Sequence, residues 1–146
     1  MDDFGHLVSS DAVAGLDHVC KQCPAESLCV VNMSFGWKKI ILEAVNKAVA
    51  SAVEKGIVVV VSAGNEDHDA CFNTPASEPT AITVGATDQF DKISRFTPPK
   101  ASNFGPCVDV YAPGSLIKSA YMRSTTFLLP MSGTSMAAPR KFFSLF

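Results

Sequence analysis

The sequence lacks three features: a marked charge imbalance, a long apolar run and an apolar leader at its start. Its 146 residues carry a formal net charge of −2, which gives no reason to expect nucleic acid or an anionic membrane as a partner. The apolar run at residues 57–61 is far too short to span a bilayer. Residues 1–6 are acidic and contain no apolar h-region, so we expect no signal peptide in this chain.

Cysteine is present in an odd number. With five cysteines, at most two disulfides can form, and one thiol stays free or bonds another chain. This number of cysteines favours an oxidising compartment, which conflicts with the expected absence of a signal peptide. Either the chain is a piece of a longer precursor, or its thiols stay reduced. Cys20 and Cys23 form a CxxC pair, but zinc needs a second ligand pair that Cys29 alone does not supply. A structural thiol or a disulfide is favoured here, with the pairing left open.

A strand, a helix and a second strand follow one another in the first half of the chain. Residues 28–34 are typical of a buried strand, and residues 38–55 of a helix. The apolar stripe of that helix comprises Ile41, Ala44, Val45, Ala48, Val49 and Ala52. Gly56 fits a C-terminal cap, and residues 57–62 form a strand that is apolar on both faces. This order predicts an α/β fold with a parallel sheet covered by helices.

Further elements are predicted on either side of this unit. Ser9 and Ser10 are N-cap candidates for a preceding helix. Strands are expected at residues 81–87 and 108–111, and an irregular surface loop at residues 96–103. The chain contains no internal repeat and no linker long enough to separate two domains.

One hydroxyl is surrounded by small residues at the start of a helix-forming run. Ser135 lies in SGTSMAAP at residues 132–139, where free N–H groups and the helix dipole stabilise an oxygen that gains negative charge. Pro139 cannot donate the helical hydrogen bond to the Ser135 carbonyl. The alternative is an ordinary Ser/Thr cap on a buried helix. Asn65, in a loop after the strand at residues 57–62, has an amide that can donate a hydrogen bond, although a plain turn there is common.

Several segments together resemble the subtilisin-like serine peptidases (subtilase family, peptidase S8), most closely their proteinase K branch. They occur in the family's order from about Ser9 to Pro139, with nearly the family's spacing. The segments are VNMS at 31–34, SAGNE at 62–66, PASEP at 75–79, ITVGA at 82–86, NFG at 103–105, DVYAPG at 109–114 and SGTSMAAP at 132–139. The resemblance implies a three-layer, parallel-sheet, subtilisin-like α/β fold that is incomplete, without the N-terminal third and the C-terminal helices.

The resemblance also implies roles for particular residues. Ser135 matches the nucleophile, and Asn65 the side chain that forms the oxyanion hole with the Ser135 backbone N–H. The substrate-binding positions are Ser34, Phe35 and Gly36 on a strand edge, and Ser62, Ala63 and Gly64 in a pocket wall.

The resemblance implies two stabilising features as well. Pro79, Ala81 and Asp109 match a structural calcium site, and the alternative for Asp109 is a solvated or hydrogen-bonded carboxylate at a strand end. Cys71 and Cys107 match a disulfide found in some bacterial relatives, which we expect if the protein is secreted. No catalytic cofactor is implied.

The sequence departs from the family in its general base. The family's Asp and His belong to an Asp-Ser/Thr-Gly turn and a His-Gly-Thr-His helix start, and neither motif exists here. Residues 1–5 resemble the end of a strand that comes after both of these catalytic residues in the family's sequence. His6, His18 and His68 lack the required context, and we expect surface roles for them.

Two other segments depart from the family. Residues 97–101 are an insertion, and residues 140–146 are a divergent, apolar tail that cuts the central helix to about two turns. We therefore expect a partial peptidase domain at residues 1–139, followed by the tail.

Three hypotheses follow from this sequence. The chain is a serine endopeptidase by descent that is inactive alone, a non-catalytic peptide-binding decoy, or a gene fragment without function. The expected partner is a polypeptide, with no nucleic acid, no membrane and the oligomeric state open. The parent protein is expected to be secreted.

Overall fold

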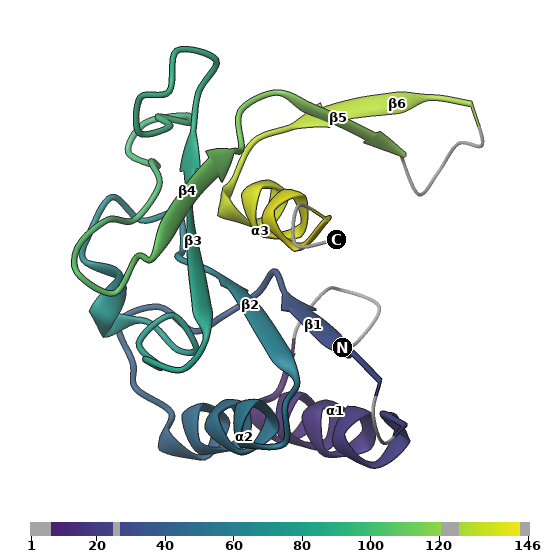
Figure 1. The fold of residues 1–146 in the computed structure, drawn as a ribbon. Coiled ribbons are helices and arrows are strands. Elements are labelled where there is room, and N and C mark those ends of the chain that lie inside the picture. Colours follow the sequence, from purple (N-terminus) through teal and green to yellow (C-terminus); the bar gives the residue numbers. More distant parts are fainter. Residues whose placement is uncertain (1–6, 25–26, 121–125, 144–146) are drawn as a thin grey trace.

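A computed structural model describes residues 7–24, 27–120 and 126–143. Its centre is a four-stranded parallel sheet with the strands in chain order, β1 (Val30–Met33), β2 (Val58–Ser62), β3 (Ile82–Thr87) and β4 (Val110–Pro113). Helices α1 (Ser9–Gln22) and α2 (Glu43–Glu54) lie on one face, and α3 (Thr134–Phe143) lies on the other (Figure 1). The predicted three-layer α/β fold is therefore present.

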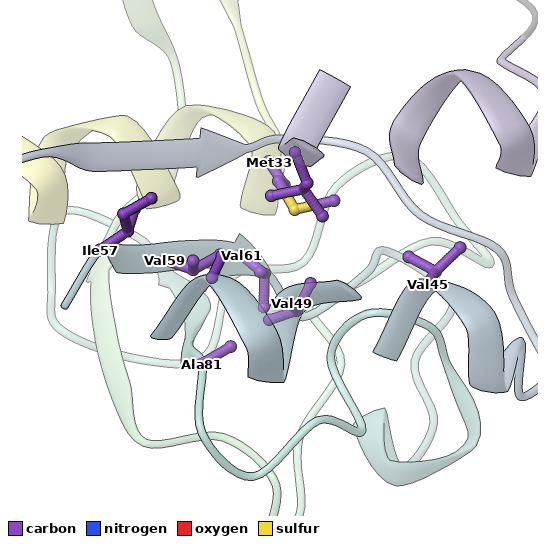
Figure 2. Packing of buried hydrophobic residues seen from close by; sticks show 9 residues of the cluster. Met33, Val45, Val49, Ile57, Val59, Val61 and Ala81 are labelled. Carbon is purple, nitrogen blue, oxygen red and sulfur yellow. The ribbon is translucent and has the colours of Figure 1, made fainter. Parts of the chain in front are cut away.

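The alternating residues of β2 supply both halves of the core. Val59 and Val61 face α2, where they pack with Met33, Val45 and other apolar residues (Figure 2). Val60 faces α3 and packs against small residues of β3, β4 and that helix, namely Val84, Ala86, Ala112, Ala137 and Ala138. Successive strand side chains point to opposite faces, so a continuous valine run fits a sheet that is covered on both sides.

The helix α2 begins at Glu43, so the predicted start near residue 38 is wrong. The residues before it make tertiary hydrogen bonds instead. Trp37 pairs with Thr74, and the Leu42 N–H donates to Thr74 Oγ1 over 2.8 Å. The buried stripe is correspondingly narrower, since Val45, Val49 and Ala52 are buried whereas Ile41 is 47% exposed. The predicted cap holds, because Gly56 directly follows the C-cap residue with a φ of +84°.

Two other local predictions need correction. Helix α1 is preceded by Val8, and Ser9 and Ser10 lie inside the helix instead of capping it with their side chains. The segment at residues 96–103 is irregular but is not all surface, because Ala101, Ser102 and Asn103 are buried. The Ser102 hydroxyl accepts a hydrogen bond from Ala86 N at 2.9 Å, which ties the segment to β3.

A hairpin that was not predicted joins β4 to α3. It consists of β5 (Ile117–Ala120) and β6 (Leu128–Met131), paired antiparallel, and it extends away from the sheet (Figure 1). Helix α3 then runs for ten residues across position 140, somewhat longer than the two turns expected. The division at residue 140 remains a prediction. His6, residues 1–5, Leu145 and Phe146 lie outside the described residues.

The structure contains two disulfides. Cys71 and Cys107 are bonded, which is the pair that the resemblance implied, and Cys23 is bonded to Cys29. Cys20 has a free thiol, so the CxxC pair is neither a disulfide nor part of a cluster of metal-ligating side chains in the described ranges.

Candidate active site

Ser135 lies at the first turn of α3, next to the carboxyl end of β1. Its hydroxyl donates a hydrogen bond of 2.8 Å to the backbone carbonyl of Ser34, one residue beyond that strand. Its backbone N–H has no hydrogen-bond partner among the described residues. An unpaired N–H at a helix N-terminus is a donor available to an anionic oxygen.

Asn65 follows the carboxyl end of β2, so parallel pairing brings it to the same edge of the sheet as Ser34. The Thr134 backbone N–H donates to Asn65 Oδ1 over 2.8 Å, and the Thr134 hydroxyl donates over 3.0 Å. Because a backbone N–H can only donate, its partner must be the amide oxygen, which fixes the orientation of the amide. The amide nitrogen of Asn65 then has no acceptor in the part of the chain that the structure describes. Thr134 is fully buried, so its two hydrogen bonds hold Asn65 against α3.

A cluster of polar side chains fixes the Asn65 loop by hydrogen bonds. The Glu66 Oε2 atom accepts hydrogen bonds from Asn65 N at 2.9 Å, Asn103 Nδ2 at 3.0 Å and Asn73 Nδ2 at 3.1 Å. Asn103 Oδ1 in turn accepts from the Glu66 N–H at 2.9 Å. Three donors on one carboxylate oxygen hold the loop in a single arrangement.

Gly64 is required by this cluster. Its φ is +104°, a conformation that L side chains rarely adopt, and an added Cβ would lie 2.4 Å from Asn103 Nδ2 and 2.5 Å from Asn73 Nδ2. Sequence reasoning identified Gly64 but missed Glu66, Asn73, Asn103 and Thr134. Asn103 belongs to a segment with no periodic pattern, so its burial had no sequence signal.

A cavity of about 390 Å³ opens beside Ser135 and Asn65. Of the predicted substrate-binding residues, four line it: Phe35, Gly36, Ser62 and Gly64. Ala63 does not, because it is fully buried in a small apolar cluster, and Ser34 contacts Ser135 instead. A second cavity of about 1260 Å³ adjoins the first at Lys38, Asn65 and Glu66, and residues 97–100, which are predicted to belong to an insertion, form part of its wall.

The strand edge next to the first cavity has unpaired backbone groups. Within the described ranges, neither Phe35 nor Gly36 makes a backbone hydrogen bond, although the following residue, Trp37, pairs with Thr74. An extended peptide can pair with such an edge.

The remaining predicted positions lie away from this edge. Asp109 precedes β4, and its Oδ2 atom accepts from the Thr83 N–H at 2.7 Å. Its second oxygen makes no hydrogen bond that the described residues provide. Pro79 is exposed and Ala81 is buried just before β3.

Neither described histidine contacts Ser135. His18 is exposed on α1, and the His68 ring pairs with Asn73 Oδ1 at 2.9 Å. His68 is therefore part of the polar cluster, not the surface residue that was predicted.

Comparison with known proteins identifies the relatives of this arrangement. The subtilase family profile matches residues 9–140. Extracellular serine proteinase of Thermus sp. (strain Rt41A) is 42% identical over 139 residues, covering 95% of this chain and 32% of that protein. Proteinase T of Parengyodontium album is 42% identical over 142 residues, covering 95% of this chain and 45% of that protein.

A solved structure gives the same result for the fold. A cold adapted subtilisin-like serine proteinase superposes with a TM-score of 0.79 at 38% identity, covering 92% of this chain and 45% of its own. The chain thus spans between about a third and a half of the length of these relatives.

Proposed function

Because the chain belongs to the subtilase family, we propose that it carries the nucleophile and oxyanion part of a serine endopeptidase site. One observation carries this proposal. Two donors that have no partner among residues 7–24, 27–120 and 126–143, the Ser135 backbone N–H and the Asn65 side-chain amide, lie at one edge of the sheet, and both residues line the same cavity. Such a pair stabilises the oxyanion formed when a serine attacks a peptide carbonyl.

The substrate proposed for this site is an extended polypeptide. Its backbone would pair with the free edge at Phe35 and Gly36, and the side chain before the scissile bond would enter the cavity of about 390 Å³. Phe35 and Trp37 give the mouth of that cavity an apolar side, with their rings 6.1 Å apart in an edge-to-face arrangement.

We further propose that residues 1–146 bind peptides without hydrolysing them. A serine hydroxyl needs a base to take its proton, and no histidine of this sequence has the family's context for that role. In subtilisin, a member of the same family, removing triad members lowers turnover by about 10⁶-fold. A non-catalytic peptide-binding module is therefore preferred over an active peptidase for this chain.

The calcium site is proposed on the chemistry of its ligands. The carbonyls of Pro79 and Ala81 and the free carboxylate oxygen of Asp109 are all hard oxygen donors, which suit Ca²⁺. Thr83 N–H fixes the Asp109 side chain at 2.7 Å, so the residues present fit such an ion. The role of calcium would be structural, joining the start of β3 to the start of β4.

We propose a secreted parent protein, since a relative is named as extracellular and the chain has two disulfides. No helix in the described part of the chain is long and apolar enough to cross a membrane.

Calorimetry with two forms of one peptide tests the oxyanion donors directly. A peptide that ends in a free carboxylate resembles a product, and its terminal oxygen can occupy the place of the oxyanion. We expect it to bind about 10–100-fold more tightly than the same peptide with a C-terminal amide, the range for hydrogen bonds to a charged group. Equal affinities would contradict the proposal.

The matched variant is Asn65→Asp. Aspartate keeps an oxygen for the Thr134 N–H, so the fold is retained, but it removes the amide donor and repels the peptide carboxylate. The preference for the carboxylate form should vanish in Asn65→Asp and persist in Ser135→Ala. Hydrolysis of the peptide by the unaltered chain, absent in Ser135→Ala, would instead identify an active peptidase.

A further inference from the structure

Ser34 and Ser135 exchange two hydrogen bonds although 101 residues separate them. The Ser34 hydroxyl donates to the Ser135 carbonyl over 2.9 Å, and the Ser135 hydroxyl donates to the Ser34 carbonyl over 2.8 Å. Both residues are half-buried. This ring of contacts joins the carboxyl end of β1 to the first turn of α3.

The first of these bonds supplies a donor that α3 lacks. In an α-helix the carbonyl of residue i accepts from the N–H of residue i+4, and for Ser135 that residue is Pro139, which has no N–H. Without another donor, the carbonyl of Ser135 would lack the hydrogen bond that the helix normally gives it. The Ser34 hydroxyl occupies the place of the missing donor.

Asn32 fixes the direction in which the Ser34 hydroxyl donates. Its side-chain amide donates to Ser34 Oγ over 2.9 Å. Since Ser34 Oγ already receives a hydrogen there, its own hydrogen is free to point to the Ser135 carbonyl. The order Asn32 to Ser34 to Ser135 is therefore a directed chain of hydrogen bonds from β1 to the helix.

The second bond determines the resting position of the Ser135 hydroxyl. A carbonyl oxygen accepts a hydrogen bond but does not take up a proton, so this contact orients the hydroxyl without activating it. Any base that reaches Ser135 must displace the Ser34 carbonyl as the acceptor.

From these contacts we propose that Ser34 is a positioning residue for Ser135, where its side chain replaces the helical donor lost at Pro139 and its carbonyl holds the hydroxyl at rest. The inference deepens the proposed function, because it rests on Ser135 being the nucleophile. It gives Ser34 a role in addition to the substrate-binding edge to which the sequence assigned it.

The Ser135 carbonyl can be observed by itself. Ser135 and Met136 form the sole Ser-Met pair in the sequence, so carbonyl-¹³C serine with ¹⁵N methionine gives one cross-peak for this peptide bond. We expect Ser34→Ala to move this carbonyl resonance upfield and to lower Tm by about 3–6 °C, the loss for one hydrogen bond in a chain of this size. Ser34→Thr, which keeps the hydroxyl, should restore both values.

The effect of Ser34→Ala is also measured in a chain that carries Pro139→Ala. Alanine supplies the missing N–H, so Ser34→Ala should lower Tm by less than half as much in this background as in the natural sequence. An equal loss in both backgrounds, or an unmoved resonance in Ser34→Ala, would overturn the inference. If Ser34→Ala alone does not fold, a folded double variant supports the inference and an unfolded one overturns it.

Two controls separate this result from other effects. Ser51→Ala, on the exposed face of α2, should leave the resonance in place and change Tm little. All spectra are recorded without peptide, so a failure of peptide binding in calorimetry counts against the proposed function and leaves the role of Ser34 intact.

Discussion

Replacing Cys71 and Cys107 by alanine opens a loop that contains Asn73 and Asn103 of the polar cluster. The bonded cysteines are 36 residues apart, and the loop-entropy relation gives a stabilisation of about 3.8 kcal/mol for a closed loop of that length. The Cys23–Cys29 disulfide closes only 6 residues, for which the same relation gives about 2.2 kcal/mol. The two double replacements should therefore differ by about 1.6 kcal/mol.

Calorimetry under non-reducing conditions measures this difference. Both variants are made with Cys20→Ala, which removes the free thiol and prevents disulfide exchange. Removing the Cys71–Cys107 disulfide should lower Tm by about 5–9 °C more than removing the Cys23–Cys29 disulfide. Each double replacement removes the same atoms, so equal Tm values for the two variants, or the reverse order, would contradict a stabilisation that depends on loop length.

Three further predictions concern single side chains. Glu66→Ala removes the shared acceptor of three donors and should cost about 3 kcal/mol, Glu66→Gln should cost less, and exposed Glu54→Ala about 0.5 kcal/mol or less, as measured by urea unfolding. Calcium should raise the Tm of the unaltered chain relative to EDTA but not that of Asp109→Asn, which still accepts the Thr83 N–H; equal shifts would contradict the site. Partial desolvation raises the pKa of Tyr111, which is 36% exposed, above its usual value of 10.0. The neutral ring therefore stabilises the fold below that pH, and stability falls as pH rises further. Tyr111→Phe should reduce this alkaline loss, and an unchanged pH profile would refute the assignment.

Most of the fold follows from sequence periodicity. The valine run of β2 faces two cores, as a strand apolar on both faces predicts, and Gly56 ends α2 where a cap glycine was expected. The first and last residues of helices and strands were less predictable because tertiary contacts determine them. The Leu42 N–H bonds the Thr74 side chain, 32 residues away, and this contact shortens α2 at its start.

The residues of the candidate site also divide into those that a local pattern predicts and those that only tertiary contacts position. Asn65 was found because an amide follows a predicted strand, where functional groups of α/β proteins gather. Ser135 was found because small residues surround it at a predicted helix start, and the resemblance to the subtilases assigned Gly64 to the pocket wall. The supporting residues Asn103 and Thr134 were missed. Their positions depend on side-chain hydrogen bonds over 37 and 69 residues of sequence, which no local pattern encodes.

In the proposed function, these 146 residues hold Ser135 beside two oxyanion donors without a base to activate it. Labelling with a fluorophosphonate probe, followed by intact-mass spectrometry, tests it most directly, with an active subtilase as the positive control. We expect the chain to be labelled no faster than its Ser135→Ala variant over an hour. Stoichiometric labelling of Ser135 within minutes, absent in Ser135→Ala, would show that the hydroxyl is activated and would contradict the proposed absence of a base.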